Sequence, residues 1–174
     1  DEKEELVKRV EDKVKDLRDK VEKSVRESTE SVRDNERRVR ESVERSRDLV
    51  RRLDELVRAG LDEEEVKKVV KRIEEDNKRL HDELRRSVEA SNEKNKKLHE
   101  DLKRLADEIR KEIDKLDQDE ELERVRKELE EVLRRAKRLN EDVLEKNREV
   151  VRRAAELNKE VKKLLKEVLD RAKT

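Results

Sequence analysis

Apolar residues recur along this chain with a period of eighteen residues. In the first third of the sequence, successive repeat units open at Val7, Val25 and Val43. Five turns of an α-helix contain about eighteen residues, at roughly 3.6 residues per turn. A heptad repeat would impose a left-handed supercoil and an eleven-residue repeat a right-handed one, but this period imposes neither. The pattern therefore predicts long and nearly straight α-helices.

Two further segments keep the same period. Repeat units open at Val66, Leu84 and Leu102 in the second segment, and valines recur with this spacing at Val125, Val143 and Val161 in the third. Such an apolar stripe is typical of a helix that packs against other helices. The repeat therefore predicts three helices joined by two turns.

The first turn is marked by its residues. Gly60 stands where a helix C-terminus favours a residue that tolerates positive φ. Asp62 follows as a candidate N-cap, and Glu65 three residues later would complete a capping box. Leu61 and Val66 hold the positions of a hydrophobic staple around this cap. The sequence therefore predicts that one helix ends before Gly60 and the next begins after Asp62.

The second turn is expected near residues 117–119, where neither Gly nor Pro marks it. The evidence is a break in phase, because the second apolar series would need apolar residues near positions held by Glu120 and Arg124. Either Asp117 or Asp119 would then cap the third helix. The alternative is one continuous helix with a stutter in its repeat.

These patterns predict an all-α fold, an up-down-up antiparallel bundle of three long, nearly straight helices with coiled-coil-like packing. We expect a single domain over residues 1–174. Its helices should span about 2–59, 62–116 and 119–173.

Ser and Asn interrupt the apolar series, mostly in the middle of each predicted helix. The positions are Ser24, Ser28, Ser31, Asn35, Ser42, Ser46, Asn77, Ser87, Ser91, Asn95, Asn140, Asn147 and Asn158. In an antiparallel hairpin, residues at one height have a constant sum of positions, which groups these side chains into layers. The expected layers are Ser24/Asn95/Asn140, Ser31/Ser87/Asn147 with Asn35 and Ser91 close by, and Ser42/Asn77/Asn158. Buried hydrogen-bond layers would penalise wrong helix registers, whereas the alternative is that these side chains are partly solvated boundary residues.

Composition narrows the possible functions. The chain has 174 residues, with 51 basic and 51 acidic side chains and a formal net charge of zero. The signs are interleaved, so no global field attracts nucleic acid or an anionic membrane. Pro, Cys, Met, Phe, Tyr and Trp are absent, which removes the aromatic side chains on which bases stack and the thiolates that bind metals. We expect no nucleic-acid partner, metal or cofactor.

The eighteen-residue repeat, the Glu/Lys/Arg surface, the acidic cap after Gly60 and the Ser/Asn layers together resemble de novo helical bundles with designed buried hydrogen-bond networks. The resemblance covers the whole chain. It implies the bundle fold. It also implies a range of roles, since members serve as monomeric scaffolds, homo-oligomers, heterodimer halves and switches. Some members carry buried histidine networks that make their assembly depend on pH.

His81 and His99 are the two histidines, and they hold the same place in successive repeats. The expected register places Ala154 and Ala136 opposite them, and such small residues suggest that space is left for the rings. Buried neutral imidazoles would make a pH-responsive element. The alternative is that both histidines merely complete hydrogen bonds at the boundary of the core. About eighteen residues of helix, roughly 27 Å, separate them, so they cannot share a metal ion.

No nucleophile–base motif, glycine-rich loop or paired acid constellation is present, so we expect no enzyme activity. No apolar stretch has membrane-spanning length, and the acidic start does not resemble a signal peptide. We therefore expect a soluble chain, cytoplasmic in a bacterial host, with no natural compartment implied. The predicted function is a designed structural scaffold that requires no partner. The alternative is a helix-binding or oligomerising module that uses the wide apolar stripe of the third helix, pH-responsive through His81 and His99.

Overall fold

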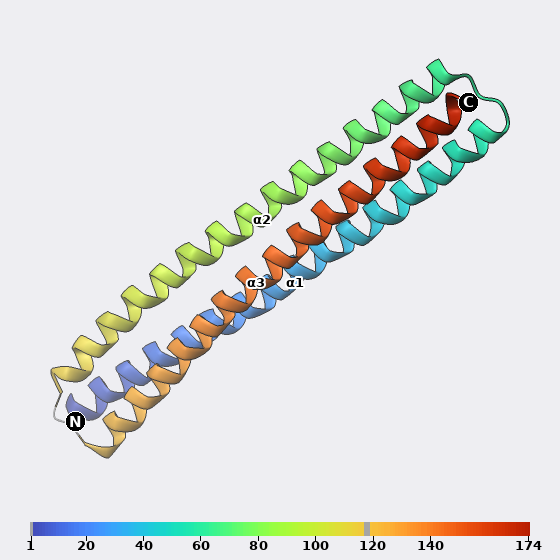
Figure 1. Cartoon of the computed structure of the whole chain (residues 1–174). Coiled ribbons are helices and arrows are strands. Elements are labelled where there is room, and N and C mark those ends of the chain that lie inside the picture. Colours follow the sequence, from blue (N-terminus) through green and yellow to red (C-terminus); the bar gives the residue numbers. More distant parts are fainter. Residues whose placement is uncertain (1, 117–118) are drawn as a thin grey trace. The chain divides into compact units, whose positions relative to one another are not determined.

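The computed structural model describes residues 2–116 and 119–174, and these residues form three α-helices (Figure 1). The helices are α1 (Glu2–Arg58), α2 (Glu63–Asp114) and α3 (Glu120–Ala172). The described residues contain no β-strand. The prediction of an all-α fold of three long helices is confirmed.

Contacts between residues divide the chain into two compact units. Unit 1 comprises Asp1–Ser31 and Ser91–Glu145, and unit 2 comprises Val32–Ala90 and Lys146–Thr174. Each helix contributes one segment to each unit. The expectation of a single domain over residues 1–174 stays a prediction.

In unit 1, α2 runs antiparallel to both α1 and α3. Ion pairs join α1 to α2 at Lys13–Glu112 and Glu27–Lys94, and join α1 to α3 at Arg18–Glu128 and Glu22–Arg135. Residue numbers fall along α2 as they rise along α1, whereas they rise together along α1 and α3. The predicted up-down-up order is therefore present in this unit.

Unit 2 shows the same order through different contacts. Side-chain hydrogen bonds join α1 to α2 at Asn35–Ser87 and Ser46–Asn77, and ion pairs join α1 to α3 at Arg47–Glu160 and Asp54–Arg171. The segments of α1 and α3 are again parallel to each other and antiparallel to α2.

The first turn lies in unit 2 and begins with a left-handed residue. Gly60 has a φ of 97°, which a side chain would make unfavourable. The Gly60 N–H donates to the Val57 carbonyl at 3.0 Å, and the Leu61 N–H donates to the Leu56 carbonyl at 2.9 Å. This pair of bonds is a Schellman motif, which satisfies carbonyls that the end of α1 would otherwise leave unpaired.

The helix after this turn begins at the predicted residue. The carbonyl of Asp62 accepts the first hydrogen bond of α2, from the Val66 N–H at 3.0 Å. Val66 is fully buried and Leu61 packs against the same apolar cluster. This arrangement is the one expected of a hydrophobic staple that fixes how the chain enters the helix.

The second turn lies in unit 1. Asp119 is the N-cap of α3, because its Oδ1 accepts a hydrogen bond from the Leu122 N–H at 3.0 Å. Asp117, the other candidate cap, and Gln118 lie outside the described residues. Since α2 ends at Asp114 and α3 begins at Glu120, the alternative of one continuous helix is wrong.

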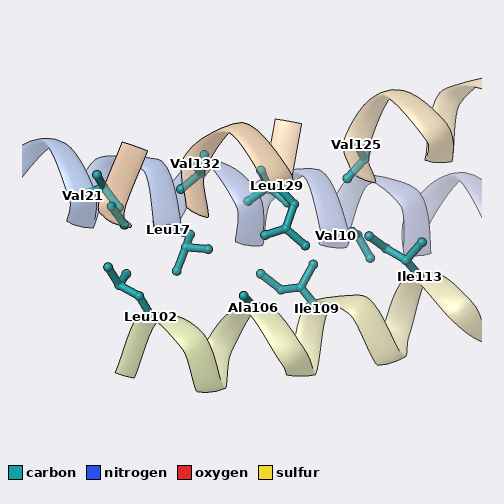
Figure 2. Packing of buried hydrophobic residues seen from close by; sticks show 12 residues of the cluster. Val10, Leu17, Val21, Leu102, Ala106, Ile109, Ile113, Val125, Leu129 and Val132 are labelled. Carbon is teal, nitrogen blue, oxygen red and sulfur yellow. The ribbon is translucent and has the colours of Figure 1, made fainter. Parts of the chain in front are cut away.

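The core of unit 1 is one large apolar cluster, to which all three helices contribute (Figure 2). Its buried members are Val10, Val14, Leu17, Val21, Leu102, Ala106, Ile109, Ile113, Val125, Leu129, Val132 and Ala136. Figure 2 shows the labelled side chains of the three helices pointing toward one another. Burial of this aliphatic surface is the main term that stabilises the unit.

The core of unit 2 is divided. The larger cluster is near the first turn and contains Val50, Leu53, Val66, Val70, Ile73, Val161, Leu165 and Val168. The smaller cluster has only Val39, Leu84 and Val150 as buried members. Polar side chains of the middle of the helices occupy the positions between the two clusters.

Candidate functional site

Unit 1 contains an amide pair formed by the buried Asn95 and the half-buried Asn140. The Asn95 Nδ2 donates to the Asn140 Oδ1 at 2.6 Å, across the interface of α2 and α3. Asn95 is only 5% exposed. These two residues are among those that the sequence positions placed at one height. The bond satisfies amide groups whose burial without a partner would cost about 1–3 kcal/mol.

Unit 2 contains a second polar layer with Asn35 at its centre. The Ser87 Oγ donates to the Asn35 Oδ1 at 3.0 Å. Asn35 is 1% exposed, and its Nδ2 has no hydrogen-bond partner among the described residues. Asn147, on α3, is also fully buried. Since α1 and α3 are parallel here, the offset seen in the Arg47–Glu160 ion pair places Asn147 level with Asn35.

A third polar layer, also in unit 2, joins Ser46 to Asn77. The Ser46 Oγ donates to the Asn77 Oδ1 at 2.8 Å, and Ser46 is buried. The same level on α3 is held by Asn158. This side chain is half-buried and has no hydrogen-bond partner among the described residues.

The observed α1–α2 pairs differ from the expected ones by about one helical turn along α1. The sequence positions placed Ser42 opposite Asn77, but the structure pairs Asn77 with Ser46. They likewise placed Ser31 opposite Ser87, whose partner is Asn35. Residues four apart share a helix face, so the spacing of polar residues alone allows both registers. The structure buries Ser46 and leaves Ser42 half-buried.

The remaining expected positions, which are serines, differ in their burial. Ser24 is buried, whereas Ser28, Ser31 and Ser91 are half-buried. The predicted positions therefore divide into a buried group that includes the Asn35, Asn95 and Asn147 side chains, and a half-buried group on the boundary of the core.

A cavity of about 380 Å³ opens in unit 2 beside the Ser46–Asn77 pair. Its apolar wall includes Val39, Leu84 and Leu157. Its polar wall includes both members of the pair, together with Asn158 and His81. The sequence did not reveal this cavity, although Ala154, which was expected opposite His81, is one of its lining residues.

His81 and His99 lie on α2, in unit 2 and unit 1 respectively, and both are half-buried. The Nδ1 of each ring is buried and has no hydrogen-bond partner among the described residues. A proton on this nitrogen would therefore be an unpaired buried donor, so the neutral ring is expected to carry its proton on Nε2.

Charged side chains form the surface of both units, where they interact mainly with one another. The Arg110 guanidinium donates to Glu130 at 2.8 Å, a hydrogen bond that raises the pKa of Arg110. The pKa of the Asp119 carboxyl is lowered, first by the Leu122 N–H and then by the Lys3 side chain. Burial raises the pKa of Glu11, and the nearby Glu121 carboxylate raises it further.

No group of three or more His, Cys, Asp or Glu side chains lies close enough together to hold a metal ion within residues 2–116 and 119–174. In the same part of the chain, no helix has both the length and the apolar character needed to cross a membrane.

No protein-family model matches the chain, and no curated protein matches its sequence. Among solved structures, one match is described as a "Computationally designed three helix bundle". It shares 17% sequence identity with this chain, and the alignment covers 98% of this chain and 88% of that one, with a TM-score of 0.44. Both the identity and the TM-score are low, and the three-helix fold of this chain rests on its own three helices.

Proposed function

We propose that this chain is a designed structural scaffold, without biochemical activity of its own, in which buried Ser and Asn layers specify the register of the helices. The observation that carries the proposal is the set of three side-chain hydrogen bonds between helices, Asn95–Asn140, Ser87–Asn35 and Ser46–Asn77. The eighteen-residue repeat within each helix and the absence of Phe, Tyr and Trp support a designed origin.

The free energies of hydrogen bonding favour the view that the Ser and Asn layers specify the helix register more than they stabilise the fold. A satisfied hydrogen bond inside a protein contributes only about 0.5–1.5 kcal/mol net, whereas an unpaired buried polar group costs about 1–3 kcal/mol. Sliding α1 along α2 by one turn in one direction would replace Ser46 by Val50 and Asn35 by Val39, which places Asn77 and Ser87 against aliphatic side chains. The opposite slide would bring the half-buried Ser42 and Ser31 to them, and would move the buried Ser46 and Asn35 away from these partners. The layers therefore act mainly by making wrong registers unfavourable.

The test replaces the amides of the layers with leucine. The variant carries leucine at Asn77, Asn95, Asn140, Asn147 and Asn158. We expect its free energy of unfolding to be equal or higher, because well-packed apolar groups commonly replace buried polar ones without loss. Its helix register or oligomeric state should become heterogeneous, as measured by cysteine crosslinking and by light scattering. A variant that stays monodisperse, with unchanged crosslinks, would contradict the specificity role.

A second candidate function is that of a helix-binding or oligomerising module. The observation that favours it is the exposure of Leu6, Leu49 and Leu56, at 39%, 37% and 50%. Light scattering on a sizing column, at about pH 7.5 and again at about pH 5, separates the two functions. A monomer at both pH values supports the scaffold. A larger species supports the module, and a mass that changes with pH would implicate His81 and His99.

A further inference from the structure

The eighteen-residue repeat places an equivalent pair of asparagines in each unit, and the structure treats the two pairs differently. In unit 1, Asn95 and Asn140 bond to each other at 2.6 Å. In unit 2 the equivalents are Asn77 and Asn158, eighteen residues away in each helix. Here the Asn77 Oδ1 accepts from Ser46, and Asn158 has no hydrogen-bond partner among the described residues. We call the unit 1 pair closed, because its two asparagines bond to each other, and the unit 2 pair open, because its two asparagines do not.

The space beside this open pair is large enough for a small molecule. The cavity measures about 380 Å³, within the range of roughly 300–1,000 Å³ that is typical of ligand pockets. An apolar cavity of about 150 Å³ already binds benzene in another protein. The smaller apolar cluster of unit 2, with Val39 and Leu84, supplies one wall, and Leu157 continues it.

The polar wall offers both a donor and an acceptor. The Asn77 Oδ1 is already used by Ser46, which leaves its Nδ2 to donate. Asn158 retains both its carbonyl oxygen and its amide group. A hydroxyl or a primary amide that enters the cavity can therefore accept from one asparagine and donate to the other.

Charge at the cavity favours a neutral ligand. The ionisable side chains that line it are Arg38, Arg45, Glu41 and Glu83, together with His81. The two arginines and two glutamates are exposed and balance each other, so they create no net field at the opening. An ion would lose its hydration against the apolar wall without gaining a counter-charge there.

We propose that this cavity binds an uncharged, largely apolar small molecule that carries one hydroxyl or amide group, with this group between Asn77 and Asn158. The apolar body of the ligand lies against the wall of Val39, Leu84 and Leu157. The inference goes beyond the scaffold function and does not depend on it, because the binding requires only unit 2.

The probe for the test is naphthol, a neutral fluorescent phenol, titrated with the full chain. The protein contains no Phe, Tyr or Trp, so its own fluorescence does not interfere. We expect saturable binding with one site for each chain. Absence of saturable binding would overturn the proposal and would mean that the cavity holds only water.

The first variant fills the cavity. Ala154→Leu adds an apolar side chain at the lining of the cavity, and Ala155→Leu makes the same change at a half-buried neighbour that does not line it. We expect Ala154→Leu to weaken naphthol binding at least about tenfold, which corresponds to about 1.4 kcal/mol. The control should bind like the parent chain, and circular dichroism would verify the helix content of both. Equal affinities of the two variants would contradict this location of the site.

The second variant tests the polar end and does not rely on the first. Asn158→Leu removes one hydrogen-bonding partner, which we expect to weaken naphthol binding by several-fold to about tenfold. The affinity for naphthalene, which has no hydroxyl, should be equal or higher. If both probes lose affinity equally, or if the parent chain binds naphthalene as tightly as naphthol, the proposed role of the asparagines is wrong.

Discussion

The two units have the same sequence period and the same three-helix arrangement, but their interiors differ. Unit 1 joins its amide pair, Asn95–Asn140, to one large cluster of aliphatic side chains. Unit 2 contains two polar layers, two separate apolar clusters and a cavity of about 380 Å³. Repetition of the polar positions therefore does not repeat the hydrogen bonds that these side chains form.

The side chains next to the two pairs are of the same types, because Val21, Leu102 and Val132 in unit 1 are the repeat equivalents of Val39, Leu84 and Val150 in unit 2. The interiors differ further along the helices, where unit 1 has the large buried side chains of Leu17, Ile109 and Leu129. One repeat away, the equivalent positions are held by the polar residues Asn35, Ser91 and Asn147. Interiors without voids gain more dispersion contacts, and an unfilled volume loses them. Unit 1 is thus suited to stability, and unit 2 retains space for a ligand.

The largest expected effect comes from truncating one leucine in each unit. Leu129 is fully buried in the unit 1 cluster, whereas Leu84 already borders the cavity of unit 2. We expect Leu129→Ala to lower the free energy of unfolding by about 4 kcal/mol, and Leu84→Ala by about 2 kcal/mol. Denaturant unfolding followed by circular dichroism measures both. Equal losses would break the comparison between a close-packed unit and an open one.

A smaller effect is expected from removing one amide of each repeated pair. Asn95→Ala leaves the Asn140 side chain without its bond, and we expect a loss of about 1–2 kcal/mol in the free energy of unfolding. Asn158 has no hydrogen-bond partner among the described residues. We therefore expect Asn158→Ala to change the free energy of unfolding by less than about 0.5 kcal/mol. The same unfolding experiment applies. A loss at Asn158 as large as that at Asn95 would show that the unit 2 pair is closed as well.

The smallest effect concerns the turn of unit 1 and depends on pH. The Leu122 N–H and the Lys3 side chain lower the pKa of Asp119. A carboxyl whose pKa is lower in the folded chain stabilises it above the unfolded pKa, and this contribution is lost as pH falls through the folded pKa. We expect Asp119→Ala to lower the thermal midpoint at neutral pH, and the difference from the parent chain to shrink in strong acid.

Asp119→Asn is the matched control for this pH effect, because it keeps the capping oxygen and removes the charge. Its thermal midpoint should lie between those of the other two chains at neutral pH. If the difference in thermal midpoint between the parent chain and Asp119→Ala stays constant down to strongly acidic pH, the role of the ionised carboxylate is contradicted.

The helices and the first turn could be predicted because their signals are local. The eighteen-residue repeat specifies which face of each helix is buried, and Gly60 marks the end of α1 by its φ of 97°. The position before a new apolar series reduced the cap of α3 to two candidates, Asp117 and Asp119, of which Asp119 caps the helix. In each case one segment of sequence contains the whole physical cause.

The α1–α2 register and the cavity could not be predicted in the same way. Ser42 and Ser46 are one turn apart on one face, so polar spacing alone allows either to meet Asn77. The choice depends on how the surrounding side chains of three helices pack together. The cavity depends on volume that no side chain fills, which is a property of many residues at once. Ala154 is not a sufficient signal, because Ala136 holds the equivalent position in unit 1 and lies in the large apolar cluster.

The measurement that tests the central claim most directly is the solvent exchange of the asparagine side-chain amide protons, followed by nuclear magnetic resonance. Asn95 donates to Asn140, whereas neither Asn77 nor Asn158 uses its amide protons in a hydrogen bond among the described residues. The account predicts that an Asn95 amide proton exchanges roughly tenfold or more slowly than those of Asn77 and Asn158. Equal protection of all three side chains would show that both pairs are closed, and would contradict the difference between the two units.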